Sequence, residues 1–380
     1  MVRSLIALLL AGGLCSPIIP PAPAFADGGK LLKALGEARG GDTIRLPAGD
    51  YGDVVLSNLD FSEPVQIRSA DPERAARFRS LRIDNVRGLK IDGITVAHPG
   101  NGAAASKIVS IENSRQVALL NSEVHGLEDK DYFGHYGIHA DGNTDIRISG
   151  NYVHDVKNGF VIYPNQGIEI SGNYVDYIGS DGFKFIGITD FLIENNTQGG
   201  HVYPLAGAGW HLDFMQFQGA GSSDGIVRGN VFLAKTDAAV QGIFMKGAAF
   251  NDILIEQNII ATGMFNGIVV NGDPGTSGMN VRDNTLINIP DIVHKATIVR
   301  VGEGSVVSVT GNLMGHEKGQ LIDGNLLLQV KHRGQPYHYN TVFAKGLPRL
   351  GMVIGDLIPV KGGPAEGFGA YARLRELLSP

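Results

Sequence analysis

The sequence predicts an all-β chain, folded as one domain into a right-handed parallel β-helix with short N-terminal and C-terminal capping helices. Two observations support this fold class. First, a unit made of an apolar-x-apolar strand, a polar pair, an Asn and a second apolar run recurs every 20 to 30 residues or so, which is typical of a solenoid. Second, apolar residues alternate within each unit, so each strand buries one face only. The copies are "IRISGNYVHDV" (146–156), "IEISGNYVDYI" (168–178), "FLIENNTQGG" (191–200), "GIVRGNVFLAK" (225–235), "ILIEQNIIATG" (253–263), "MNVRDNTLINI" (279–289) and "VVSVTGNLMG" (306–315).

The asparagine of each unit indicates where the coil turns. The seven markers are Asn151, Asn173, Asn196, Asn230, Asn258, Asn284 and Asn312, with spacings of 22, 23, 34, 28, 26 and 28 residues. Asn tolerates left-handed backbone and bonds its own backbone in sharp turns. Stacked parallel strands lie about 4.8 Å apart, so successive amides are expected to form a ladder along the axis. A β-sandwich with Asn-Gly turns would show hairpins instead of this spacing.

The first 26 residues are predicted to be a secretory signal. Arg3 gives a positive start, "LIALLLAGGL" an apolar stretch, and Ala24-Phe25-Ala26 a cleavage site. The apolar run is too short for a membrane span, so no membrane anchor is expected. We therefore expect residues 27–380 to form the mature domain, in a secreted or periplasmic location. The only cysteine, Cys15, lies in the signal, so the mature protein is expected to have no disulfide.

Composition limits the partners. The formal net charge of −6 argues against nucleic acid. An anionic glycan remains compatible with this charge, because local Lys and His side chains can reverse the field inside a groove. We expect a monomer that acts on a polysaccharide substrate.

The ends and two insertions depart from the repeat. Residues 29–40 place Leu31, Leu32, Leu35 and Ala38 on one helical face, which predicts a helical cap over the first coil. Residues 367–378 predict an amphipathic closing helix. Insertions at 125–145 and 199–225 are longer than a plain coil needs, and functional sites usually lie on such loops.

Aligning the glycines that open the strand before each Asn repeat gives columns of residues on one face. The inward column is Ile138, Phe160, Phe183, Met215, Ile243 and Ile268. The outward column is His139, Val161, Lys184, Gln216, Phe244 and Val269. Two residues further lie Asp141, Tyr163, Ile186, Gln218, Lys246 and Asn271; before the glycines lie Tyr136, Asn158, Asp181, Asp213, Gln241 and Asn266. Because parallel strands stack at about 4.8 Å, these polar residues are expected to share one exposed sheet, beside the only tryptophan, Trp210.

The chain resembles the parallel β-helix polysaccharide lyases of the chondroitinase B/alginate lyase type and the related uronan C5-epimerases. The resemblance rests on "LLKALGEARGGDTIRLPAGDY" (31–51) and on the "ISGNYV" repeats. It implies a uronic-acid polysaccharide as substrate and, in the lyase type, a lysine base, an arginine and often Ca²⁺. Lys184 matches that lysine by role. Arg228 and Arg300 are expected on other parts of their coils, which leaves the arginine unassigned.

Removal of the C5 proton of a uronic acid needs a base and groups that hold charge on the carboxylate. Lys184 is the expected base, and His139 or Tyr163 the expected acid. His211, Gln216 or Lys246 would hold the carboxylate, and Trp210 would stack on a sugar ring. Asp213 would orient His211 or, like Asp141 and Asp181, ligate a cation. A Ca²⁺ site from these three carboxylates stays open, although no EF-hand or nonapeptide calcium loop occurs, and we name no metal ligand.

Other interpretations remain open at this stage. Asp181 and Asp213 lie in one column and would supply the paired carboxylates of a β-helix glycoside hydrolase, although the "GHG" motif of polygalacturonases is missing. An epimerase would return the proton to the opposite face of the sugar. A non-catalytic glycan-binding solenoid would leave the polar residues as solvated positions, with Lys184 paired to Asp181 or Asp213.

Overall fold

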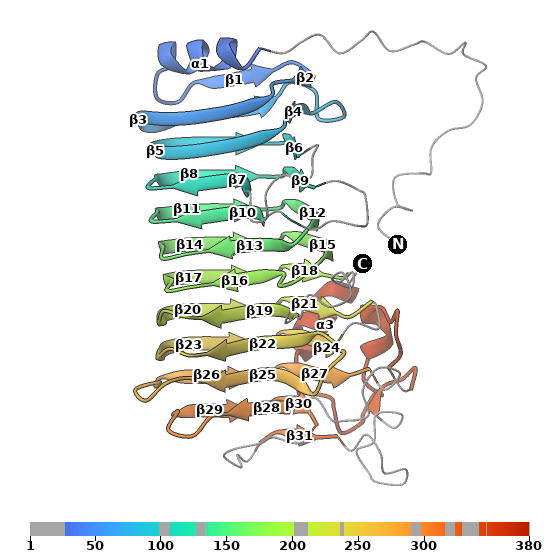
Figure 1. Cartoon of the computed structure of the whole chain (residues 1–380). Coiled ribbons are helices and arrows are strands. Elements are labelled where there is room, and N and C mark those ends of the chain that lie inside the picture. The colour runs from blue at the N-terminus through green and yellow to red at the C-terminus, as the bar shows by residue number, and fades with distance from the viewer. Residues whose placement is uncertain are drawn as a thin grey trace, which may run out of the picture.

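The structure is a computed structural model that describes residues 27–98, 107–126, 134, 136–200, 212–235, 239–289, 298–315, 324–328, 342–346 and 348–379. In these ranges the chain forms a right-handed parallel β-helix, as predicted, with coils stacked one over the next (Figure 1). The strands form sheets of 19 and 12 members, and all pairings between named strands are parallel.

Each regular coil contributes one strand to each of three faces. The first face contains β7 (Lys107–Glu112), β10 (Tyr136–Asp141), β13 (Asn158–Ile162), β16 (Phe183–Phe185), β19 (Asp213–Gln218), β22 (Gln241–Lys246), β25 (Asn266–Asn271) and β28 (Ile298–Val301). The second contains β8 (Arg115–Leu120), β11 (Thr144–Ser149), β14 (Gln166–Ser171), β17 (Thr189–Glu194), β20 (Ser222–Arg228), β23 (Phe250–Glu256), β26 (Met279–Arg282) and β29 (Val307–Thr310). The third contains β9 (Glu123–His125), β12 (Tyr152–Val156), β15 (Tyr174–Ile178), β18 (Thr197–Gln198), β21 (Val231–Leu233), β24 (Ile259–Thr262), β27 (Thr285–Asn288), β30 (Leu313–Met314) and β31 (Leu326–Leu327).

The first coils are built from longer and shorter strands. They are β1 (Thr43–Leu46), β2 (Gly49–Asp50), β3 (Asp53–Ser69), β4 (Ala76–Phe78), β5 (Ser80–Asp92) and β6 (Thr95–Ala97). The long strands β3 and β5 span two faces, since the two halves of β5 pair with β7 and β8.

The inward column predicted from the glycine alignment is confirmed. Ile138 pairs with Phe160, Phe160 with Phe183, and the column continues through the later coils. All its members are fully buried, and the rings of Phe160 and Phe183 stack with centroids 4.8 Å apart. The stacked apolar column therefore fills the interior that each strand leaves open until the next coil covers it.

The asparagine ladder is also confirmed. All seven markers are buried, and each side-chain amide donates to the Oδ1 of the next coil's asparagine at 2.9–3.0 Å, from Asn151 as far as Asn325. Each Oδ1 also accepts the backbone N–H of the preceding coil's asparagine, as Asn230 does for Asn196 at 3.0 Å. The ladder satisfies buried backbone groups at a turn where no strand pairing can do so.

The expected left-handed backbone lies one residue earlier than predicted. The residue before each marker has positive φ, for example Gly150 (69°), Asn195 (56°) and Gln257 (54°), whereas the markers do not. The marker side chain points inward to the neighbouring coil, so the strain of the turn is carried by the residue beside it.

Glycines on the first face allow the coils to approach closely. A Cβ on Gly242 would lie 1.9 Å from the carbonyl oxygen of Gly267, and a Cβ on Gly159 would lie 2.6 Å from that of Gly182. Both neighbours are backbone atoms, which cannot move aside. The repeated glycine is therefore explained by packing between coils.

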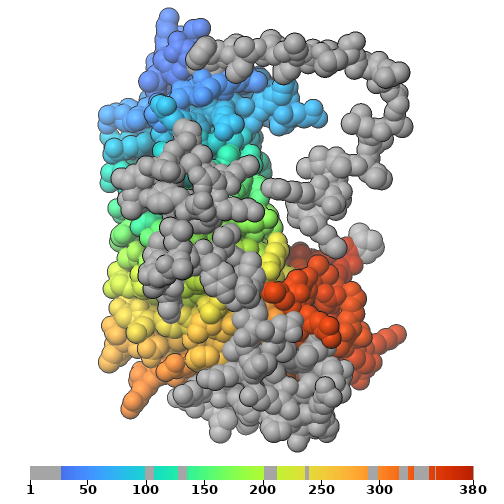
Figure 2. Space-filling view, turned by 45° about the vertical axis from the view of Figure 1, so that its right-hand side comes forward, coloured from blue at the N-terminus to red at the C-terminus, as the bar shows by residue number. Residues whose placement is uncertain are grey.

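Helices lie at both ends of the chain, as predicted. Helix α1 (Gly28–Glu37) covers the first coil with Leu31 and Leu35 buried, but Leu32 is exposed, contrary to the predicted apolar face. Helix α3 (Tyr371–Leu378) follows the 3₁₀ turn η2 (Ile354–Leu357) and lies against the flank of the later coils (Figures 1 and 2). There the Nε of Arg373 donates to the Gly229 carbonyl at 3.1 Å. In the ranges that the structure describes, no helix has the length and apolar character needed to cross a membrane.

Candidate functional site

The first face carries the outward column that the sequence predicts. Val161 pairs with both His139 and Lys184, Lys184 pairs with Gln216, and the column continues through Phe244 and Val269. Residues separated by up to 130 positions therefore share one face because each coil stacks on the last.

The expected exposure is wrong for seven polar residues of the predicted columns. His139 is 3% exposed, Gln216 6% and Asp213 0%, and Asn158, Asp181, Gln241 and Asn266 are also buried. Solvent reaches the site at Lys184, whose side chain is 25% exposed, and at Tyr163, which is 39% exposed. Asp141 and Lys246, in the neighbouring column, are exposed as predicted. The face is thus a covered polar surface with few points of access.

Asp181 connects Lys184 to the interior of this surface. The Lys184 Nζ lies 3.8 Å from the Oδ2 of Asp181. The Oδ1 of Asp181 accepts the backbone N–H of Asp213 at 3.3 Å, and Asn158 approaches its Oδ2 at 3.4 Å. A buried carboxylate held from several sides fixes the position of the partly exposed lysine side chain beside it.

Asp213 is the centre of a buried polar network. Its Oδ2 accepts from the Nε2 of Gln216 at 2.8 Å, and its Oδ1 accepts from the Nε2 of Gln241 at 3.1 Å. Gln241 in turn accepts a hydrogen bond from Asn266. Because Asp213 is fully buried and hydrogen-bonded, it orients two amides and is shielded from solvent. Gln216 Oε1 and Asn266 Oδ1 are buried and have no hydrogen-bond partner in the part of the chain that the structure describes.

His139 is held in its neutral form. Burial lowers the pKa of its imidazole to about 4, and Lys107 adds to this effect, while Glu112 and Asp141 oppose it. Among the described residues its Nδ1 has no hydrogen-bond partner, the Oε1 of Glu112 lying 3.8 Å away, and its ring packs against Tyr163 with centroids 5.5 Å apart. A neutral, buried imidazole does not fit the role of a protonated acid near pH 7.

Two arginines also belong to this column, one on each side of Lys184. Arg300 pairs with Val269, so the expectation that it lies elsewhere on its coil is wrong; Arg82, which the glycine alignment did not reveal, pairs with Ser110. Each is four strands from Lys184, roughly 19 Å at about 4.8 Å per strand, too far to share one sugar with it. Arg228 lies on the second face, as expected, and binds Glu194 at 2.7 Å.

The roles expected for Trp210 and His211, and the Ca²⁺ site, stay predictions. Trp210 and His211 lie outside the described residues. Within the described ranges, no group of three or more His, Cys, Asp or Glu side chains is placed to hold a metal ion. Asp141 lies on β10, three strands from Asp213 on β19.

A second cluster of titratable side chains lies on the third face, and the sequence analysis did not find it. The Nδ1 of His154 lies 2.6 Å from Asp155 and its Nε2 3.1 Å from Glu123. Burial opposes the charged imidazole, but these two carboxylates outweigh it and raise the pKa of His154 to about 9. Its ring stacks between His125 and Tyr152. Only the pairing of β9 with β12 brings these residues together.

Comparison with known families assigns the fold. The model described as "Right handed beta helix region" matches residues 79–202 and 107–286, which together cover more than half of the chain. The chain belongs to the right-handed β-helix family. A comparison with curated protein sequences gives no match.

Solved structures with the same fold have diverse activities. A lacto-N-biosidase from Eubacterium ramulus has a TM-score of 0.52 at 12% identity. The match covers 79% of this chain and 64% of the lacto-N-biosidase, slightly less than two thirds of the length of that protein. An alginate lyase from Paenibacillus sp. str. FPU-7 has a TM-score of 0.49 at 17% identity, over 77% of this chain and 98% of its own. PfbA, a surface adhesin of Streptococcus pneumoniae, has a TM-score of 0.45 at 13% identity, over 74% and 84%. At these identities the likeness concerns the fold alone.

Proposed function

We propose that this protein is an exported enzyme that cleaves a uronic-acid-containing polysaccharide by β-elimination on its first face, after removal of residues 1–26. The observation that carries the proposal is Lys184, a partly exposed side chain held by the buried Asp181 and one strand away from the exposed Tyr163. A structural lysine on a solenoid surface needs no buried carboxylate network behind it, whereas a proton-transfer group must be held in place.

The geometry matches the two proton transfers of β-elimination. Lys184, acting as the free amine, takes the C5 proton; the electron pair forms the C4–C5 double bond as the C4–O4 bond breaks. The phenol of Tyr163 gives its proton to the departing O4. Tyr163 lies on the neighbouring strand, two residues beyond the partner of Lys184. Strand spacing and rise then place the two Cα atoms roughly 8 Å apart, which allows both side chains to reach one glycosidic linkage.

The reaction also needs a group that stabilises negative charge on the substrate carboxylate. Removal of the C5 proton places negative charge there, and a cation nearby stabilises it. We assign this role to Lys246, which is exposed on β22 in the column next to Lys184. Asp181 and Asp213 act as positioning residues, since both are buried.

The same geometry bears on the alternative functions, a glycoside hydrolase and a C5-epimerase. A glycoside hydrolase needs two carboxyl groups at the scissile bond, and the complete burial of Asp213 counts against that assignment. A C5-epimerase would share the first step with a lyase, using a donor on the opposite side of the sugar. The fold itself supports no choice, because it occurs in enzymes and in an adhesin.

A product analysis separates these activities. The protein is incubated with alginate, pectate, glycosaminoglycans and bacterial exopolysaccharides, in ordinary water and in D₂O. New ultraviolet absorbance from a C4–C5 double bond supports the proposal. Deuterium at C5 without cleavage indicates an epimerase, reducing ends without unsaturation indicate a hydrolase, and binding without turnover indicates a glycan-binding solenoid; each of these three results would overturn it.

Two conservative variants test the assigned roles. Lys184→Arg keeps the cation but removes the proton acceptor, so we expect kcat to fall about 10²-fold or more, in the range of general-base catalysis. Tyr163→Phe removes only the phenol proton and should slow cleavage most for poor leaving groups. Lys90→Arg, an exposed lysine on β5, is the matched control. Retention of near-normal kcat by Lys184→Arg would show that Lys184 holds charge and is not the base.

A further inference from the structure

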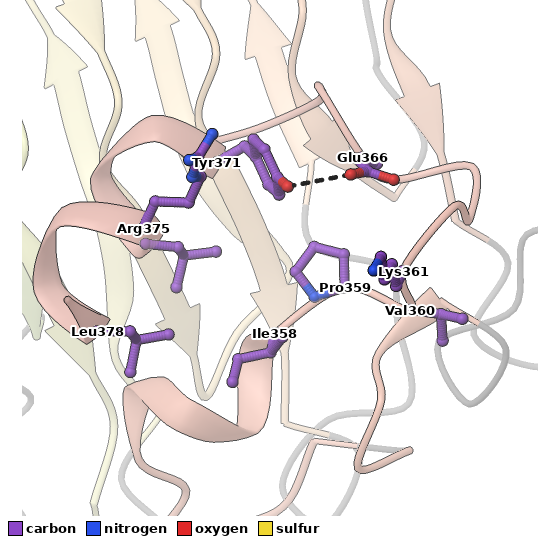
Figure 3. A pocket seen from close by; sticks show the side chains of 9 residues that line it. Ile358, Pro359, Val360, Lys361, Glu366, Tyr371, Arg375 and Leu378 are labelled. Carbon is purple, nitrogen blue, oxygen red and sulfur yellow. Dashed lines mark hydrogen bonds between the residues drawn. The ribbon is translucent and has the colours of Figure 1, made fainter. Parts of the chain in front are cut away.

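A cavity of about 350 Å³ lies in the C-terminal segment, remote in sequence from the first-face residues discussed above. Ile358, Pro359 and Val360 lie on one side of it, and Leu378 of α3 lies on the other (Figure 3). Leu374 of α3 also lines it. This volume is at the small end of the range for small-molecule sites, about 300–1,000 Å³.

The walls of this cavity are apolar and open to solvent. Ile358, Val360 and Leu378 are exposed, while Leu374 is buried. Leu350, Val353 and Leu377 are exposed large apolar residues of the same segment. Several exposed apolar side chains around a hollow are unfavourable in water and are typical of a binding site.

The charges beside the cavity select the kind of ligand. Lys361 and Arg375 line it, and neither forms an ion pair within the part of the chain that the structure describes; Arg375 lies 6.0 Å from the centroid of the Tyr371 ring. The one lining carboxylate, Glu366, accepts hydrogen bonds from the Tyr371 hydroxyl at 3.3 Å and from the Gly362 N–H at 2.7 Å, and the two cations still leave the lining with a net positive charge. In a chain of net charge −6, two unpaired cations beside an apolar hollow favour an anionic head on an apolar tail.

We propose that this cavity binds a single-chain anionic amphiphile of the fatty-acid type. The tail would lie between Ile358 and Leu378 over Leu374, and the carboxylate would lie between Lys361 and Arg375. This proposal is independent of the β-elimination proposed above, since the cavity shares no residue with the first face.

Titration calorimetry with three ten-carbon amphiphiles, each below its micelle-forming concentration, tests the charge preference. Decanoate should bind with one molecule per chain, about three- to tenfold tighter than uncharged decyl glucoside, because each exposed cation contributes modestly. Decyltrimethylammonium should bind most weakly. Equal affinity for all three would overturn the proposal, and so would binding to phosphatidylglycerol vesicles without binding of free decanoate, which would indicate a membrane surface instead.

Variants then test the location. Leu378→Asp places a charge in the path of the tail and should abolish decanoate binding, whereas Val306→Asp, at another exposed apolar position, should not. Lys361→Gln with Arg375→Gln should lower the affinity for decanoate to that for decyl glucoside and leave the latter unchanged. Lys90→Gln with Arg147→Gln is the matched control pair on exposed surface. Normal decanoate binding by Leu378→Asp, with the fold intact by circular dichroism, would refute the site.

Discussion

Replacement of one asparagine in the ladder should destabilise the protein strongly. Asn230 is fully buried, and its amide donates to the Ile193 carbonyl at 3.0 Å and to Asn258 Oδ1 at 2.9 Å. Its own Oδ1 accepts both the backbone N–H and the side-chain amide of Asn196 at 3.0 Å. Asn230→Ala removes all four hydrogen bonds without changing the apolar core.

The expected magnitude follows from which groups lose their partners. Asn258 Oδ1 still accepts the backbone N–H of residue 230, and the Asn196 amide still donates to the Ile170 carbonyl. The Asn196 N–H and the Ile193 carbonyl lose the partner that the Asn230 side chain gave them. At about 1–3 kcal/mol for each buried unsatisfied group, the free energy of unfolding should fall by about 2–6 kcal/mol. This is a large part of the usual stability of a folded domain, about 5–15 kcal/mol.

Urea unfolding followed by circular dichroism measures this loss. The matched control is Asn280→Ala, an exposed asparagine on β26, whose free energy of unfolding should stay within about 0.5 kcal/mol of the wild type. Asn230→Asp should also destabilise, because a carboxylate keeps the acceptor and loses both donors. If Asn230→Ala unfolds at the same urea concentration as Asn280→Ala, the ladder does not stabilise the coils.

Three further predictions concern stability. Because the pKa of His154 is raised to about 9, its contribution to the free energy of unfolding is fully present below pH ~6.5 and is lost as the pH rises through 9. This loss is at most about 3 kcal/mol, and it should be absent from a thermal-unfolding pH series of His154→Gln. For His139 the pH dependence of stability is reversed, because its pKa is lowered to about 4. The free energy of unfolding should fall as the pH falls from ~6.5 to 4, and His139→Gln should reduce this fall in the same pH series. Gly242→Ala should cost several kcal/mol in urea unfolding, since its Cβ would meet the Gly267 carbonyl, whereas Gly36→Ala, with open space in α1, should be neutral or stabilising.

Much of the architecture could be predicted because it depends on local periodicity. The alternation that buries Ile138 and Phe160 is visible within a single strand, and the spacing of the asparagines gives the length of each coil. Once strands of known phase stack in parallel, the pairing of His139, Val161 and Lys184 follows without any long-range information.

The burial of the site could not be predicted in this way. Register places Gln216 and Asp213 on the outward side, but it does not indicate which outward positions are shielded from solvent. The hydrogen bonds to Asp213, from Gln216 within β19 and from Gln241 on the next coil, likewise depend on side-chain rotamers.

Arg300 shows a second limit of sequence alignment. The register of β25 and β28 shifts between Asn266 and Ile268, so Ile298 and Val299 pair with residues two apart. This irregularity moves Arg300 into the column of Lys184, and the sequence there has no opening glycine to reveal it. The position of the left-handed residue was missed for a related reason, because the side chain of each ladder asparagine bonds the next coil and leaves the turn to its neighbour.

The central claim is that Lys184 removes the C5 proton of a uronic acid. The most direct measurement is the initial rate of new ultraviolet absorbance, on the best uronic-acid polymer of the product screen, for wild type, Lys184→Ala and Lys90→Ala. Elimination should fall to the uncatalysed background in Lys184→Ala and stay at the wild-type rate in Lys90→Ala. Full-rate elimination by a folded Lys184→Ala variant would contradict the account.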